Sequence, residues 1–142
     1  MNCAFCRIVS GEVEAEVVWR SEDAVAFLDH RPLFPGHVLL IPARHIATLA
    51  DLPAPEVGPL FQIAQRLERA VEAALGADGT FIAINNKVSQ SVPHLHIHVV
   101  PRRKGDGLKG FFWPRLGYES DGQRRETATR IRAALSADTR VL

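Results

Sequence analysis

The sequence predicts an α+β domain in which an antiparallel sheet is covered on one side by helices. Short apolar segments bounded by turn residues are typical of strands, and apolar residues at helical spacing are typical of a helix. The expected strands are 17–19, 24–28, 38–41, 81–84 and 94–100. A long helix is expected to start at Pro53 and Pro55 and to stop at Gly76, and a last helix is expected from about 123 to 137. The order is therefore strands, one long helix, strands and a last helix.

Turn residues separate the first three expected strands. Ser21-Glu22-Asp23 lies between the first two strands, and segment 30–37 holds two prolines and a glycine, which favour a loop. The continuous apolar run Val38–Ile41 ends at Pro42, and a run of this kind fits a fully covered central strand.

Proline and glycine also bound the long helix. Pro53 and Pro55 indicate its start, and Gly76 indicates its stop. Its apolar stripe consists of Leu60, Ile63, Ala64, Leu67, Val71, Ala74 and Leu75. Glycines and a proline predict an irregular segment over 105–114, and the last helix has a shorter stripe of Ala128, Ile131, Ala134 and Leu135.

Length and composition are those of one globular domain. The chain has 142 residues, 46% hydrophobic and 23% charged, with a formal charge of +1. A length of this order suffices for a real core, and the charge balance indicates neither nucleic acid nor a membrane as partner. The N-terminus lacks an apolar signal core, so we expect a cytoplasmic protein.

The two cysteines, Cys3 and Cys6, form a C-x-x-C pair at the N-terminus. In a reducing compartment a structural disulfide is not expected, which leaves metal binding, redox chemistry or plain packing. A redox pair normally follows a strand at a helix N-terminus, where its thiol pKa is lowered. Since no strand precedes this pair, redox chemistry is the least favoured reading.

Three histidines alternate along the expected strand 94–100. Because alternate residues of a strand face the same way, His94, His96 and His98 should line one face while the apolar residues between them face a core. Three buried imidazoles in register are hard to explain by packing, since each needs partners for both nitrogens. Two functions remain open: a metal site, and nucleophilic attack by a neutral imidazole on phosphorus.

The residues before the histidines favour phosphoryl chemistry. Asn85, Asn86, Gln90 and Ser91 are neutral polar groups that can stabilise charge developing on a phosphoryl group. This stretch contains none of the carboxylates that usually join histidines around a catalytic metal. The loop 85–91 therefore predicts an anion cradle.

The segment "HLHIHVV" fits the pattern H-φ-H-φ-H-φ-φ and resembles the signature of the histidine triad (HIT) family of nucleotide hydrolases and transferases. "CAFCRIVSGE" resembles the opening of zinc-containing bacterial members, and "AFLDHRPLFPGHVLLIPARH" the nucleotide-facing strand, loop and central strand. The resemblance covers about residues 3–103. It implies a single HIT domain over 1–142, with about five antiparallel strands, one long helix, and a C-terminal extension over 104–142 that ends in a helix.

The resemblance also assigns roles. His96 would be the nucleophile that becomes transiently nucleotidylated, and His98 would face the α-phosphate with Gln90 and Ser91. Ser91 would also serve the leaving group. Asp29 would bind ribose hydroxyls, and Asn85 would belong to the same nucleotide site. The walls of the base pocket would be Phe5, Ile8, Phe27, Leu28 and His30.

A structural zinc site follows from the same resemblance. Members with this cysteine pair hold a tetrahedral zinc, which here would be bound by Cys3, Cys6, His45 and His94. A closed four-coordinate site is structural, so no catalytic metal is expected. The metal reading and the nucleophile reading would then both hold, on different histidines. His37 is expected to be structural.

The implied activity is hydrolysis or transfer at the α-phosphorus of a nucleotide conjugate such as an adenosine phosphoramidate. The alternatives are a dinucleoside polyphosphate hydrolase or phosphorylase, and a slow nucleotide-binding sensor or scaffold. A homodimer is expected from the family habit. Ser89 stands where the family usually has glycine, Lys87 lies in the same loop, and Trp113 resembles a tryptophan that related proteins direct toward the partner subunit.

Overall fold

The computed structural model describes residues 2–109 and 115–138. The chain divides into two compact units, Met1–Asp106 and Gly107–Leu142, and each is considered by itself. Trp113 lies outside the described residues. Within the described part, no helix combines the length and apolarity needed to cross a bilayer.

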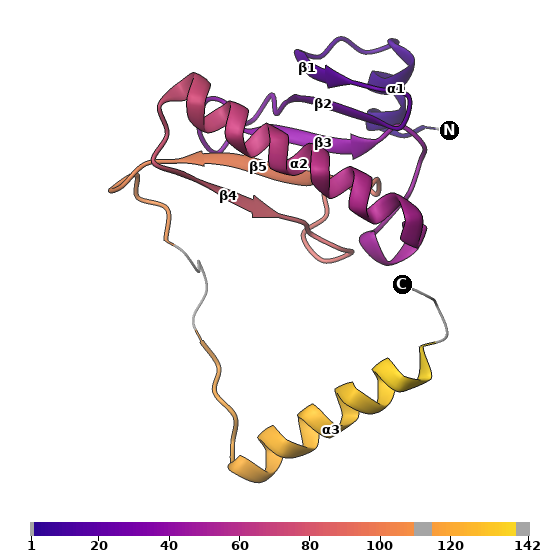
Figure 1. The fold of residues 1–142 in the computed structure, drawn as a ribbon, viewed down its shortest axis with the longest axis vertical. Helices are drawn as coiled ribbons and strands as arrows, with labels where there is room; N and C mark the ends of the chain where they lie inside the picture. Colours follow the sequence, from indigo (N-terminus) through magenta and orange to yellow (C-terminus); the bar gives the residue numbers. More distant parts are fainter. Residues whose placement is uncertain (1, 110–114, 139–142) are drawn as a thin grey trace. The chain divides into compact units, whose positions relative to one another are not determined.

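The first unit is built on a five-stranded antiparallel sheet with strand order β1-β2-β3-β5-β4 (Figure 1). Its strands are β1 (Val17–Arg20), β2 (Ala24–Leu28), β3 (Val38–Pro42), β4 (Gly79–Ala83) and β5 (Ile97–Arg102). All five residues of β3 are buried. The continuous apolar run therefore forms a central strand, as the sequence predicts, and the predicted α+β fold class is confirmed.

Helix α2 (Ala54–Leu75) lies across one face of the sheet (Figure 1). Its buried residues Leu60, Ala64, Leu67 and Val71 pack in one cluster with residues of β2, β3 and β5. The helix ends at Gly76, whose φ of 61° is in the left-handed region that glycine adopts without strain. Both ends of the long helix agree with the prediction from proline and glycine.

The opposite face of the sheet is also covered, which corrects the expectation of cover on one side. Helix α1 (Ala4–Ser10) packs there, and its Phe5 joins Val25, Phe27, Leu39 and Ile41 in a second core cluster. A helix of seven residues has little stability of its own, so burial against the sheet must hold it. Periodicity could not reveal this helix because it spans barely two turns.

The strand that carries the triad is shorter than predicted. Strand β5 begins at Ile97, so His94 and His96 precede it and only His98 pairs within the sheet. The alternation of faces nevertheless holds, since Leu95, Ile97 and Val99 are fully buried in the α2-side cluster. Ahead of the ladder, the N–H of Leu95 donates to the carbonyl of Ile46 rather than to a strand.

The second unit contains helix α3 (Asp121–Ala137), close to its predicted bounds. The side chain of its N-cap, Ser120, accepts a hydrogen bond from the backbone N–H of Gln123. None of its described residues is buried; Ile131 and Leu135 of the predicted stripe are 57% and 68% exposed. The proposal of a single domain over 1–142, like that of a homodimer, stays a prediction.

Candidate active site and metal centre

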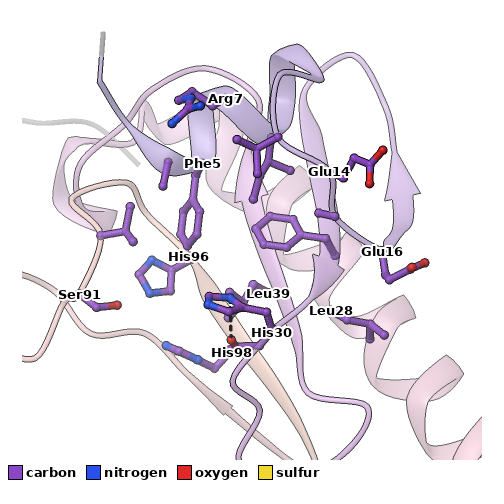
Figure 2. Close-up of a pocket in the computed structure, with 17 residues that line it drawn as sticks. Phe5, Arg7, Glu14, Glu16, Leu28, His30, Leu39, Ser91, His96 and His98 are labelled. Carbon is purple, nitrogen blue, oxygen red and sulfur yellow. Dashed lines mark ion pairs between the residues drawn. The ribbon is translucent and has the colours of Figure 1, made fainter.

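A cavity of about 1050 Å³ lies on the α1 side of the sheet (Figure 2). Its walls come from α1, the segment before β1, the end of β2 with the loop after it, and the approach to β5. Nine residues predicted for catalysis or nucleotide binding line it: Phe5, Ile8, Phe27, Leu28, Asp29, His30, Ser91, His96 and His98. Segments far apart in the sequence therefore converge on one cavity.

His96 is 3% exposed, and a hydrogen bond to a backbone carbonyl two residues earlier holds its ring. Its Nδ1 lies 2.7 Å from the carbonyl oxygen of His94. Because a carbonyl only accepts, Nδ1 must carry the proton, and the neutral ring then has its lone pair on Nε2. Phe5 lies edge-on to this ring, with the two centroids 5.1 Å apart. His96 is thus presented to the cavity as a fixed imidazole whose Nε2 is in the nucleophilic form.

His98 is connected to His37 by a hydrogen bond. The backbone N–H of Leu33 donates to His37 Nδ1 at 3.1 Å, and His37 Nε2 lies 2.9 Å from His98 Nδ1. The first bond makes His37 Nδ1 an acceptor, so His37 Nε2 carries the proton and donates it to His98 Nδ1. His98 must then carry its own proton on Nε2. That atom is buried and has no hydrogen-bond partner among the described residues.

Burial keeps both of these imidazoles neutral. Burial, together with the neighbouring His96 and His37, lowers the pKa of His98 to about 4, while Asp29 opposes the shift. Burial also lowers the pKa of His37. A neutral His98 with a proton on Nε2 is a hydrogen-bond donor without a partner, which suits a phosphoryl oxygen.

The loop before the triad uses its polar side chains unequally. Ser91 lines the cavity. The side chain of Gln90 instead forms hydrogen bonds with the backbone. Its amide nitrogen donates to the carbonyl of Ala47 at 2.7 Å, and its amide oxygen accepts from the backbone N–H of Lys87 at 2.8 Å. Neither Gln90 nor Asn85 lines the cavity. Their contact with phosphate stays a prediction.

The backbone of this loop explains the family's usual glycine. Lys87 and Ser89 have φ angles of 69° and 59°, and they are the two non-glycine residues with positive φ in the described part of the chain. This region favours glycine because it has no Cβ. Ser89 therefore keeps the conformation that glycine normally provides.

Asp29 lies where the loop after β2 turns back. Its N–H donates to the carbonyl of His37, and its carboxylate accepts from the N–H of Arg31 at 2.9 Å. Asp29, His37 and His98 have possible metal-ligand atoms within 4.8 Å of one another. The hydrogen bond from Leu33 places a proton on the His37 nitrogen that faces His98, however, so neither nitrogen of His37 has a lone pair left for a metal.

Cys3, Cys6, His45 and His94 form a separate cluster, with one ligand atom of each within 4.8 Å of the others. His94 Nδ1 lies 3.6 Å from the sulfur of each cysteine, and His45 Nδ1 lies 3.3 Å from that of Cys6. Sulfur and nitrogen ligands of one tetrahedral zinc are about 3.6 Å apart when Zn–S is about 2.3 Å and Zn–N about 2.0–2.1 Å. The spacing therefore fits zinc.

The hydrogen bonding of His94 also fits a metal ligand. Its Nε2 lies 2.9 Å from the carbonyl of Pro42, so Nε2 carries the proton and Nδ1 has its lone pair directed at the sulfurs. Burial raises the pKa of the Cys6 thiol, and the adjacent Cys3 raises it further. A bound cation would supply the charge that two neighbouring thiolates require.

Several residues of the cavity were not predicted from the sequence. Leu39 pairs with Phe27 across β2 and β3, and strand alternation could have identified it. Residues 13–16 also line the cavity, because the N–H of Leu28 donates to the carbonyl of Glu16 and brings this segment alongside β2. His37 was expected to be structural, and no local pattern indicates that it contacts His98.

Comparison with known proteins identifies the family. The model of the HIT domain matches residues 10–105. An uncharacterized HIT-like protein of Mycobacterium tuberculosis is 39% identical over 141 residues, which cover 96% of this chain and 94% of the relative. An asymmetrical bis(5'-nucleosyl)-tetraphosphatase of Schizosaccharomyces pombe is 36% identical, over a region that covers 66% of this chain and 53% of the relative. An adenylylsulfatase of Arabidopsis thaliana is 32% identical, over a region that covers 75% of this chain and 55% of the relative.

Solved structures agree. A HIT family protein of Bacillus subtilis has a TM-score of 0.86 at 28% identity and covers 97% of this chain and 100% of its own. A zinc-bound histidine triad family protein of Mycobacterium smegmatis has a TM-score of 0.73 at 39% identity, with 94% and 98% covered. This chain belongs to the HIT family, and its fold is that of bacterial members.

Proposed function

We propose that this protein cleaves nucleotide conjugates at the α-phosphorus, with adenosine phosphoramidates and similar AMP conjugates as substrates, through a nucleotidyl-His96 intermediate. One observation carries the proposal: the hydrogen bond from His96 Nδ1 to the His94 carbonyl leaves Nε2 as the nucleophilic nitrogen in the cavity. The relatives named above as a tetraphosphatase and an adenylylsulfatase support nucleotide hydrolysis or transfer as the general activity.

The residues around His96 support a two-step reaction. His96 Nε2 attacks the α-phosphorus, a nitrogen–phosphorus bond forms, and the bond to the leaving group breaks. The leaving group takes a proton from the Ser91 hydroxyl or from water. Water then attacks the phosphorus, the nitrogen–phosphorus bond breaks, and the proton of the water returns to Ser91 or passes to solvent. AMP and neutral His96 are released. The Nε2–H of His98 stabilises the phosphoryl oxygens in both steps.

The remaining residues bind the nucleoside. The cavity has apolar walls, to which Phe5 and Phe27 contribute in an edge-to-face pair with centroids 5.4 Å apart, and a base fits against walls of this kind. Asp29 is the ribose ligand. Zinc would have a structural role: Cys3, Cys6, His45 and His94 would bind it, and it would fix the N-terminus to the sheet.

Two substrates test the proposal. Wild type and His96→Ala are incubated with an adenosine phosphoramidate and with a dinucleoside polyphosphate, and AMP release is measured. Turnover of the phosphoramidate that is lost in His96→Ala supports the proposal, as does acid-labile label on His96 after rapid quenching. Preference for the dinucleotide supports the alternative function, that of a dinucleoside polyphosphate hydrolase or phosphorylase, which the similarity to the tetraphosphatase favours. Tight AMP binding without turnover, or label on another side chain, would overturn the mechanism.

A further inference from the structure

Helix α1 contributes to two sites at once. It carries Cys6 and is preceded by its N-cap Cys3, and both belong to the metal cluster. Between them in the sequence lies Phe5, which lines the nucleotide cavity. Since the three residues share one short segment, the cluster and the cavity wall cannot move independently.

Phe5 contacts the nucleophile as well as the cavity. Its ring is edge-to-face with His96, at a centroid distance of 5.1 Å and an interplanar angle of 86°. The same ring lies 5.9 Å from that of His94. Figure 2 shows Phe5 directly beside His96. The phenyl ring therefore occupies space into which the His96 side chain would otherwise rotate.

We propose that Phe5 is a positioning residue for His96, and that the Cys3/Cys6/His45/His94 cluster acts on the reaction through it. The inference rests on the proposed function. The cluster holds α1 against the sheet, α1 holds Phe5, and Phe5 keeps the His96 ring in the orientation in which Nδ1 bonds the His94 carbonyl. Nucleotide binding alone would give Phe5 an effect on KM, whereas positioning gives it an effect on kcat.

The hydrogen bond that orients His96 gives the cluster a second connection to the nucleophile. His94 contributes its ring to the cluster and its backbone carbonyl to His96 Nδ1. Loss of the metal would release both the ring of His94 and helix α1. The consequence is a nucleophile that samples other rotamers and both tautomers.

The test compares two residues on the same helix. Phe5→Leu keeps an apolar side chain in the cavity wall but removes the phenyl ring that contacts His96. Ile8→Ala shortens another wall residue of the same helix, and Ile8 has no aromatic ring that could contact His96. We expect Phe5→Leu to lower kcat for an AMP conjugate by about 10- to 100-fold, the loss produced by a misplaced reacting group. Ile8→Ala should raise KM and leave kcat within about twofold.

The metal is tested in the same assay. Removal of the metal from wild type by a chelator should lower kcat as Phe5→Leu does. In the Phe5→Leu variant the chelator should lower kcat by a smaller factor than in wild type, because both changes release the same constraint on His96. Imidazole nitrogen NMR supplies a readout apart from activity. In wild type His96 should be protonated on Nδ1, whereas Phe5→Leu and the chelated protein should show mixed tautomers.

The outcomes separate this inference from the function on which it rests. If wild type turns over nucleotide conjugates but Phe5→Leu changes KM alone, or if its His96 keeps a single tautomer, the positioning role is wrong and the proposed function stands. If the effects of chelation and Phe5→Leu multiply fully, the cluster does not act through Phe5. If wild type has no turnover and no labelled His96, the proposed function fails first.

Discussion

Nε2 of His37 lies 2.9 Å from Nδ1 of His98, although 61 residues separate them in the chain. Because the N–H of Leu33 already bonds His37 Nδ1, this contact determines which nitrogen of His98 carries its proton. The protonation pattern of His98, which lines the cavity, is thus set by His37, which does not line it.

Substitution of His37 should therefore impair catalysis, although His37 does not line the cavity in which the substrate would bind. We expect His37→Phe to lower kcat/KM for an AMP conjugate by about 10- to 100-fold, comparable to losing an outer partner that orients a functional histidine. His37→Gln, whose amide can donate to His98, should recover part of the activity. Steady-state kinetics measure this effect. Equal losses in the two variants would indicate that the packing of His37, and not its hydrogen bond, matters.

The lowered pKa values of the buried histidines predict a loss of stability in mild acid. Folded His98 takes up a proton near pH 4, whereas the unfolded chain does so near 6.5. Between these values the unfolded state binds more protons, so the free energy of unfolding falls as the pH drops from about 6.5 to about 4. Urea unfolding across this range measures it. His98→Asn should lose less stability than wild type over the same interval, and an equal loss would contradict the assignment.

The cluster at the N-terminus predicts a metal content. Protein purified without chelator should contain about one zinc per chain, and Cys6→Ser should retain less than half an equivalent, because three ligands hold a structural zinc poorly. Elemental analysis gives the content, and thermal unfolding should show a lower Tm for the variant. His30→Ala, which changes a histidine outside the cluster, is the control. Zinc-free wild type would defeat the prediction.

Gly36 predicts a stability effect at the loop that carries His37. Its φ is 97°, and a Cβ added there would collide with the side chain of Leu75 at the end of α2. Gly36→Ala should destabilise the protein by about 1–3 kcal/mol, chiefly because alanine is strained at this φ, and the Leu75 side chain must also move aside. Gly79→Ala, where nothing lies within 4 Å of an added Cβ, should change stability by less than about 0.5 kcal/mol. Denaturant unfolding compares the two variants.

The sequence by itself determined the strands, the two longer helices and the chemical identity of the triad, but not the short helix α1 or the exact start of β5. Local signals sufficed for this: the apolar run of β3, the proline and glycine that bound α2, and the alternation of His94, His96 and His98 with apolar residues. Each signal depends on residues close together in the chain, because strand and helix periods are local properties of the backbone. The family pattern added the assignments to particular residues.

Only the tertiary structure decided which atoms meet. The tautomer of His98 and the contact of Phe5 with the nucleophile depend on residues far apart in the sequence. The tautomer of His96 depends on a carbonyl only two residues away, but the bond to it forms only in the folded backbone geometry, as does the position of residues 13–16 beside β2. Strand β5 begins later than the histidine pattern suggests because Leu95 bonds to Ile46 outside the sheet. Such contacts arise from packing of both faces of one sheet, and no local spacing encodes them.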